Sequence, residues 1–284
     1  MSKIAVVTDS TAWIPKDLTT KYNITVAPQV LIFGEQTYND GVDIQPDEFY
    51  ARIKTTKVMP TTSQVPIVTM QKVFSDLVAQ DFEVLGIFIS SKLSGTIQSA
   101  VQGREALGAA ASKVQVMDSQ STAMALGFTV LAAARAIEGG ANMAEAKAVA
   151  EKAIGQTSVY FAVDTLEFLH RGGRIGGAAR LLGTALNMKP VLAVIDGRVE
   201  AIERIRTKGK AVDRVLELVA EKTKGKQPIH LATLHANAAG EARELLERAT
   251  KELNPVESIL TEVSPVVGNH AGPGTVGLAY LFGM

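Results

Sequence analysis

Hydroxyl and carboxylate side chains follow three apolar segments in the first half of the chain. The segments 4–7, 84–89 and 114–117 lead respectively into Thr8-Asp9-Ser10, Ser90 to Thr96 and Asp118-Ser119. Such side chains are preferred caps of helix N-termini, and free amides at a helix N-terminus also favour an anion. Capping explains any one cluster alone. Three clusters at the carboxyl ends of parallel strands would share one edge of a sheet, which indicates a binding site there.

Three adjacent hydroxyls occur in a fourth polar segment. The segment 55–65 is predicted to be a loop, and it contains Thr61, Thr62 and Ser63 just before a predicted helix over 66–78. Neutral donors beside a helix N-terminus suit a carboxylate, because they supply hydrogen bonds and a favourable dipole.

One of the four histidines lies among glycines and a proline. His270 falls in the segment 268–274, which is predicted to be a constrained loop whose glycines let the backbone approach a ligand. Ser94 and His270 could in principle form a hydrolase pair, but the nucleophile elbow GxSxG is absent. His230 lies in an apolar segment and is predicted to be a core histidine. The absence of HExxH and of a tight His/Asp/Glu cluster argues against a metal site.

An arginine- and glycine-rich stretch covers residues 170–177. Its spacing matches neither the phosphate loop nor the dinucleotide-binding GxGxxG pattern. It is either a flexible turn between helices or a contact surface for a partner. In the second case Arg171 and Arg174, together with Arg180, would offer forked donors to acidic protein surface or to phosphate.

The order of apolar segments predicts an α/β protein with two domains. Continuous apolar strands alternate with helices over residues 1–155, as in a Rossmann-like parallel sheet. Residues 156–284 differ: Asp196-Gly197 between apolar runs predicts a hairpin, and helices are expected at 208–223 and 238–253. A mixed or antiparallel sheet is therefore predicted for this second domain. The segment 55–80 could pack with either domain, and a ligand would lie in the cleft between them.

Composition excludes several classes of function. The chain has 284 residues, and its 29 basic residues balance 29 acidic ones, so it has no overall positive field to attract nucleic acid. It has no cysteine, which excludes disulfides and thiolate chemistry. The apolar run at residues 4–7 is too short for a signal peptide, and no run is long enough to span a membrane. A cytoplasmic location is expected.

An ordered set of segments resembles the DegV family of bacterial fatty-acid-binding proteins, which are carrier subunits of fatty-acid kinase. Each segment is weak alone, but the ordered set is specific and covers nearly the whole chain. The segments are Val7-Thr8-Asp9-Ser10-Thr11, Pro60-Thr61-Thr62-Ser63-Gln64, residues 90–96, Asp118-Ser119, residues 169–175, residues 188–192, Arg206-Thr207-Lys208 and residues 270–274. Val65 stands where family members often have a proline, which affects only the expected helix start.

The resemblance implies that one long-chain fatty acid binds between two domains. By match to the family motifs, its carboxylate would meet Thr62 and Ser63, Ser94 with the Gly95 backbone, and His270. The carrier would present the carboxylate to a separate ATP-dependent kinase, with Arg171 and Arg174 as candidates for docking it. No catalytic residue, metal or cofactor is implied beyond the bound fatty acid, and transient membrane contact would allow lipid exchange.

Two other classes of function stay open at this point. The chain could be a stand-alone serine/histidine hydrolase or phosphotransferase that acts on an acyl substrate. It could also be an interaction protein in which the arginine- and glycine-rich stretch is the working surface.

Overall fold

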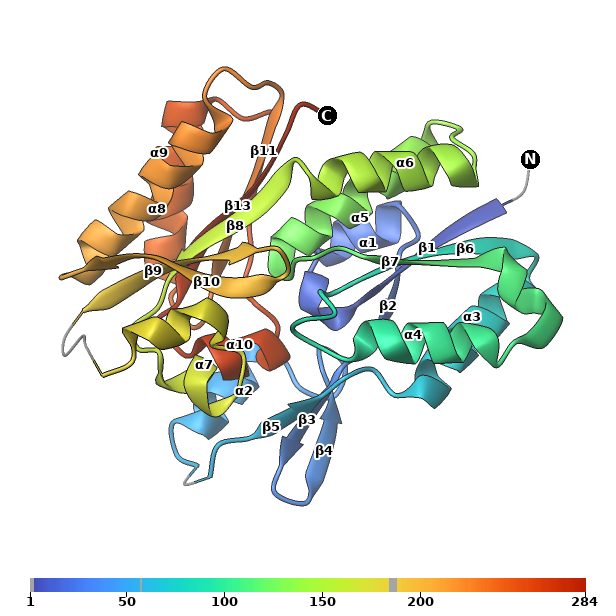
Figure 1. Cartoon of the computed structure of the whole chain (residues 1–284), viewed down its shortest axis with the longest axis horizontal. Helices are drawn as coiled ribbons and strands as arrows, with labels where there is room; N and C mark the ends of the chain where they lie inside the picture. Colours follow the sequence, from blue (N-terminus) through green and yellow to red (C-terminus); the bar gives the residue numbers. More distant parts are fainter. Residues whose placement is uncertain (1–2, 57, 184–187) are drawn as a thin grey trace.

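The first sheet of the structure is parallel, as continuous apolar strands predict. The computed structural model describes residues 3–56, 58–183 and 188–284. The sheet has the strand order β2-β1-β6-β7 and is flanked by helices (Figure 1). Its elements are β1 (Lys3–Asp9), β2 (Thr25–Ala27), β6 (Phe82–Phe88), β7 (Val114–Asp118), α1 (Lys16–Lys21), α3 (Ile67–Ala79), α4 (Thr96–Glu105), α5 (Ala123–Glu138), α6 (Met143–Ile154) and the 3-10 helices η1 (Ser10–Ala12) and η2 (Gly108–Lys113).

The second half forms a six-stranded mixed sheet, also as predicted. Its order is β10-β9-β8-β13-β11-β12, and only the β11–β12 pair is parallel. The predicted hairpin joins β9 to β10, with Asp196 and Gly197 at positive φ. The elements are β8 (Thr157–Ala162), β9 (Lys189–Ile195), β10 (Arg198–Ile205), β11 (Ile229–His235), β12 (Glu257–Leu260), β13 (Val276–Phe282), α7 (Glu167–Arg171), α8 (Lys208–Thr223), α9 (Ala239–Leu253), α10 (Pro265–Ala271) and the 3-10 helix η3 (Gly176–Leu181).

A third, antiparallel sheet was not predicted. It has the order β4-β3-β5 and projects from the lower side of the molecule in Figure 1. The segment 55–65 is therefore not a loop throughout, because residues 61–63 pair with β3. Its elements are β3 (Val30–Phe33), β4 (Gln36–Asn39), β5 (Thr61–Ser63) and the neighbouring helix α2 (Pro46–Ile53).

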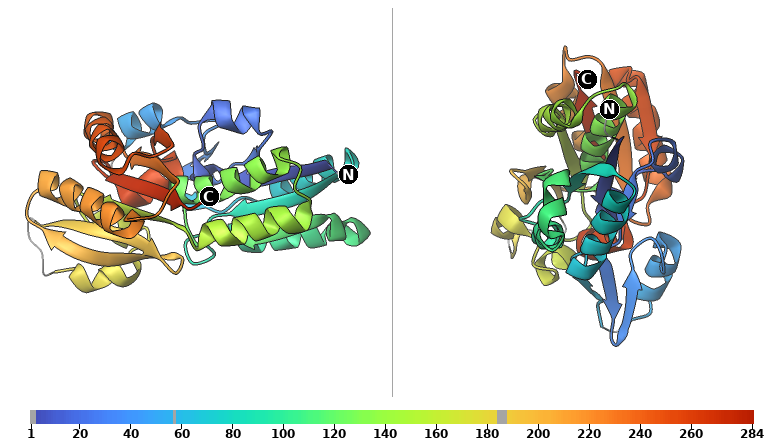
Figure 2. Two further views of the ribbon diagram at one scale, coloured as in Figure 1. Left: turned by 90° about the horizontal axis from the view of Figure 1, so that it is seen from above. Right: turned by 90° about the vertical axis from the view of Figure 1, so that its right-hand side faces the viewer.

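Helix α5 joins the two main sheets. It packs on strands of both, and residues 123–134 are all buried. Figures 1 and 2 show it in the middle of the molecule, with the parallel sheet to one side and the mixed sheet to the other. Alanine is abundant in this helix, so strands can approach it closely from both sides. The predicted boundary at residues 155/156 falls between α6 and β8, and it stays a prediction because one hydrophobic core spans both sheets.

The segment 268–274, predicted to be a loop, is partly helical. Most of it belongs to helix α10, and only residues after Ala271 form a turn. Ser264 caps this helix by accepting a hydrogen bond from the Val267 amide, and Pro265 occupies its first turn. His270 therefore lies in the last turn of a helix rather than in a loop.

Candidate functional site

A cavity lies between the two main sheets, beside the start of α5. It contains about 1000 Å³ of empty space, including the space at its open mouth. Most of its wall is aliphatic or aromatic and comes from both halves of the chain. These apolar residues are Ile89, Leu93, Ala123, Val159, Phe161, Leu169, Val194, Val199, Leu234, Val263, Val266, Val267 and Ala271.

The polar part of the wall contains most of the residues singled out in the sequence. Thr62, Ser63, Ser94, Gly95, Arg174 and His270 all line this one cavity, together with Thr11, Gln29, Gln64, Thr122 and Thr275. These residues come from β5, from helix α10, from the 3-10 helix η1 and from connecting segments in both halves of the chain. The cavity thus combines a largely apolar wall with a set of hydrogen-bonding groups that are neutral except for Arg174.

The Thr62 hydroxyl and the His270 Nε2 atom form a hydrogen bond of 2.8 Å. They lie 208 residues apart in the sequence, one in β5 and one in α10. A second bond ties the same elements, because the Asn269 side-chain amide donates to the Pro60 carbonyl at 3.0 Å. The three-stranded sheet is therefore held against the helix that contains His270.

The His270 ring is enclosed and neutral. Burial, and secondarily the Arg174 charge, lowers the pKa of His270 to about 4. The ring lies on the Cα atom of Gly172, where any side chain would collide with Nδ1. Nδ1 has no hydrogen-bond partner in the described part of the chain. An unpaired acceptor nitrogen costs less than an unpaired buried N–H, so this environment favours the tautomer with the proton on Nε2.

Ser94 and Gly95 form the entrance to helix α4. The Ser94 hydroxyl accepts a 3.3 Å bond from the Thr96 amide and lies 3.0 Å from the Thr96 hydroxyl. The Gln64 side chain lies on the Cα atom of Gly95 and donates to the Ser99 hydroxyl at 2.9 Å. Gln64 thereby connects the end of β5 to the first turn of α4, a role that the sequence analysis did not assign.

The two arginines predicted to contact a partner occupy different environments. Arg171 is exposed and pairs with Glu167 at 2.6 Å, outside the cavity wall. Arg174 lines the cavity, and its guanidinium donates to the Leu93 carbonyl at 3.1 Å and to the Gly172 carbonyl at 2.7 Å. Arg174 is thus largely engaged in holding two turns together, whereas Arg171 is accessible. The partner-binding role stays a prediction for both.

The geometry gives little support to a serine/histidine pair. Ser94 makes its hydrogen bonds within its own turn, and His270 bonds to Thr62 instead. No acid orients the histidine ring among the residues that the structure describes, because Nδ1 is unpartnered. His230, predicted as a core histidine, bonds to Glu257 at 2.8 Å away from the cavity.

Known proteins share this fold. A model of a protein family, described as "Uncharacterised protein, DegV family", matches residues 3–283. A DegV domain-containing protein of Clostridium perfringens is 35% identical over 279 residues, which cover 98% of each chain. The chain belongs to the DegV family.

Two solved structures of DegV-family proteins share the whole architecture. A DegV protein from Thermus thermophilus, described as binding fatty acid, is 34% identical, with a TM-score of 0.93 over 99% of both chains. DegV from Bacillus subtilis, described as a fatty-acid-binding protein, is 32% identical, with a TM-score of 0.90 over the full length of both chains. The predicted two-domain α/β fold is confirmed.

Neither a metal centre nor a membrane helix is found in this DegV-family chain within residues 3–56, 58–183 and 188–284. No group of three or more His, Asp or Glu side chains there could hold a metal ion. No helix in those ranges has the length and hydropathy needed to cross a bilayer.

Two buried carboxylates lie behind the cavity. Asp9 accepts hydrogen bonds from the Ile89 amide, the Thr11 backbone and hydroxyl, and the Gln29 side chain. Asp40 accepts from the Ser10 hydroxyl at 2.6 Å and from the Val266 amide, at the start of α10, at 3.2 Å. Burial raises the pKa of Asp9 and raises the pKa of Asp40 to about 6. Asp40 thus links the end of β1 to the helix that contains His270.

The raised pKa of Asp40 predicts a specific pH dependence of stability. The folded state holds this proton more tightly than the unfolded state, so its contribution is present below about pH 4 and is lost as pH rises through about 6. Asp40→Asn removes the titration. The free energy of unfolding of the variant, relative to that of the unmodified chain, should therefore rise by roughly 2.4 kcal/mol between pH 4 and pH 7, at about 1.4 kcal/mol per pKa unit.

Urea denaturation at a series of pH values measures this difference. The exposed Asp17, changed to Asn, is measured in parallel as the matched control. A flat difference for Asp40→Asn would contradict the assignment.

Proposed function

We propose that this chain binds one long-chain fatty acid in the cavity between its two main sheets. The observation behind the proposal is a long apolar wall that meets a set of neutral donors around the Thr62–His270 bond. Fatty-acid binding by the DegV proteins of Thermus thermophilus and Bacillus subtilis, which share the full fold, supports the same conclusion. The ligand site would comprise Thr62, Ser63, Ser94, Gly95 and His270, with the two domains taken as residues 1–155 and 156–284.

The hydrocarbon chain would supply most of the affinity. Burying about sixteen carbons contributes roughly 12 kcal/mol at ~0.8 kcal/mol per methylene, before the cost of association. The aliphatic residues from both sheets provide the surface on which it would pack. The polar end would then mainly determine the orientation of the lipid.

The carboxylate would be held by neutral donors. With the proton of His270 on Nε2, this atom donates to the Thr62 oxygen, and the Thr62 hydroxyl proton is directed to the ligand. The Ser94 hydroxyl and the amides at the start of α4 would provide further donors, together with the positive end of the helix dipole. Such bonds compensate for burial of the carboxylate without enclosing it behind a fixed counter-charge.

The chemistry of phosphorylation would belong to a separate fatty-acid kinase. A carboxylate oxygen must remain accessible to attack a phosphoryl donor, and neutral contacts from one side leave it so. The unpartnered Nδ1 of His270 and the local bonds of Ser94 supply no activated nucleophile, which weighs against a stand-alone hydrolase or phosphotransferase. The exposed Arg171 is the better candidate for contact with the kinase. The protein would be cytoplasmic and would contact a membrane briefly when it exchanges lipid.

The direct test of this function is lipid occupancy. We expect native mass spectrometry of the purified chain to show one bound fatty acid, which extraction would identify. Val194→Trp should fill the cavity and lower occupancy at least tenfold, because Val194 is buried in its wall. Val256→Trp, at an exposed site, is the matched control and should leave occupancy unchanged. Lipid-free wild-type protein, or equal occupancy in both variants, would refute lipid binding in this cavity.

The division between tail and headgroup leads to a second expectation. Thr62→Val removes the hydroxyl at nearly constant volume, as does Thr61→Val at the exposed neighbouring position. Loss of one hydrogen bond to a charged group lowers an equilibrium or rate constant that depends on it by about tenfold or more. Acyl-phosphate formation with a fatty-acid kinase should fall by that factor in Thr62→Val, with less than about threefold loss of bound lipid. Equal losses of both, or equal effects of both variants, would contradict this division.

A third expectation concerns the kinase contact. Arg171→Glu reverses an exposed charge and breaks only its surface pair with Glu167, so the stability of the chain should hardly change. The association rate with the kinase should fall severalfold at low salt, and the effect should shrink at high salt. Arg243→Glu, on α9, is the matched control. Unchanged association of Arg171→Glu, measured by stopped-flow fluorescence, would exclude this docking site.

A further inference from the structure

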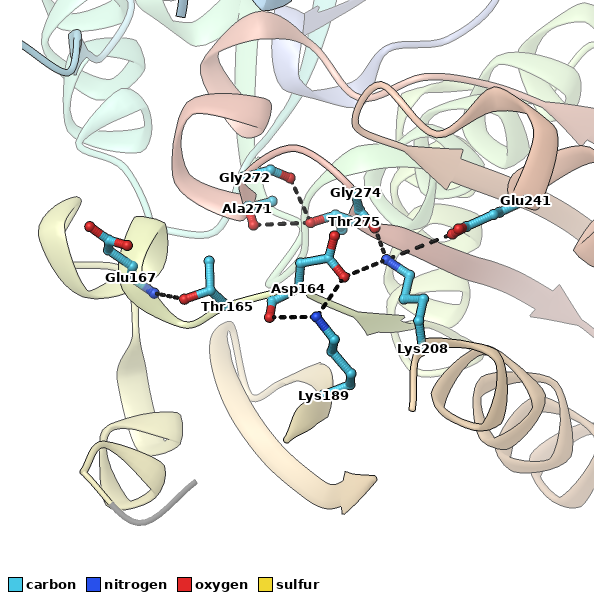
Figure 3. A network of polar contacts seen from close by, with 10 residues as sticks. All are labelled: Asp164, Thr165, Glu167, Lys189, Lys208, Glu241, Ala271, Gly272, Gly274 and Thr275. Carbon is cyan, nitrogen blue, oxygen red and sulfur yellow. Dashed lines mark hydrogen bonds and ion pairs between the residues drawn. The ribbon is translucent and has the colours of Figure 1, made fainter. Parts of the chain in front are cut away.

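The turn that follows helix α10 is held by a half-buried lysine. The Lys208 ammonium donates to the Gly274 carbonyl and lies 3.3 Å from a carboxylate oxygen of Asp164 (Figure 3). Its side chain is only 18% exposed, far less than the lysines of most surface ion pairs in this chain. Lys208 stands at the first position of α8, remote in sequence from His270. None of the roles proposed so far uses it.

The turn itself has little freedom to rearrange. Gly272 and Gly274 both have φ of +82°, and a side chain on Gly274 would collide with the Asp164 carboxylate. The Thr275 hydroxyl donates to the Ala271 and Gly272 carbonyls at 3.0 and 2.8 Å, and the Gly274 amide donates to the Ala236 carbonyl at 2.8 Å. The Lys208 contact is the one charged link in this set, and it joins the Gly274 carbonyl to Asp164.

Asp164 connects the same lysine to the other side of the histidine ring. It lies two residues after the end of β8 and precedes Thr165, whose hydroxyl accepts a hydrogen bond from the Glu167 amide at the start of α7. Helix α7 ends at Gly172, on which the His270 ring lies. Lys189 also pairs with Asp164 at 3.2 Å, so the carboxylate sits between two cations (Figure 3). The Asp164–Lys208 pair therefore ties α7 to the turn after α10.

We propose that Lys208, through Asp164 and the Gly274 carbonyl, is a positioning residue for His270. The ring must meet the Thr62 hydroxyl on one side and Gly172 on the other, and both distances depend on where α10 ends relative to α7. Lys208 does not line the cavity. Its effect would be transmitted through the backbone of residues 271–274. The inference rests on the proposed binding of a fatty-acid carboxylate at Thr62 and His270.

The test uses palmitate labelled with ¹³C at its carboxyl carbon, bound to the full chain and titrated by NMR. Lys208→Ala should raise the midpoint of the carboxyl titration by at least half a pH unit, because displaced donors stabilise the carboxylate less. It should also lower acyl-phosphate formation about tenfold at unchanged occupancy. Lys208→Arg keeps a donor and should recover most of both effects. Lys210→Ala, at an exposed site two residues away, is the matched control and should behave as wild type.

The outcomes separate this inference from the function on which it depends. A Lys208→Ala chain that binds palmitate and titrates as wild type would overturn the positioning role and leave fatty-acid binding intact. A loss of thermal stability without a shift in the carboxyl titration would equally overturn it, because a purely structural role predicts that result. Wild-type protein that binds no palmitate would overturn both. If Lys208→Ala does not fold, Asp164→Asn keeps the shape of the partner, and the same shift is expected.

Discussion

Burial of α5 between two sheets is the constraint on which the rest of the molecule depends. A helix with residues 123–134 wholly buried must be covered on all sides, and neither sheet alone can do so. The two sheets therefore share one core across the helix. The cavity lies at the N-terminal end of α5, with Thr122 and Ala123 in its wall. The cavity is thus a consequence of how the two halves pack.

A cavity with a mainly apolar wall needs hydrogen-bonding groups only where a ligand headgroup would lie. The groups around the Thr62–His270 bond are neutral ones. Burial keeps His270 uncharged, and Arg174 uses its guanidinium on the Leu93 and Gly172 carbonyls. A buried cation would bind a carboxylate more firmly, but it would also lower the reactivity of the carboxylate oxygen toward a phosphoryl group. These neutral groups therefore suit the proposed role, in which the chain presents its ligand to a separate kinase.

Sequence patterns predicted the elements whose signal is local. The continuous apolar strands, the Asp196-Gly197 hairpin and helix α8 over 208–223 lie where expected. The β4-β3-β5 sheet was missed because its strands have only three or four residues and because β4 and β5 are mostly polar, so that the short apolar run of β3 has no apolar partner strand in the sequence. Helix α10 was taken for a loop because glycine and asparagine disfavour helices, whereas its Ser264 cap and tertiary packing outweigh that preference. The family resemblance named Thr62 and His270, but spacing alone could not pair residues 208 positions apart.

Helix α10 explains why charged residues are buried or half-buried so close to an apolar cavity. A seven-residue helix has little stability of its own, so its position must come from tertiary contacts. Asp40 accepts the Val266 amide at its start, and Lys208 binds the Gly274 carbonyl just after its end. Burial removes water from the Asp40 carboxylate and disfavours its charged form, so its pKa rises to about 6. Apolar packing alone would allow such a short helix to slide along the cavity wall, because dispersion contacts have no preferred direction. Directional bonds at both ends remove that freedom, and the side chain whose location they define is His270.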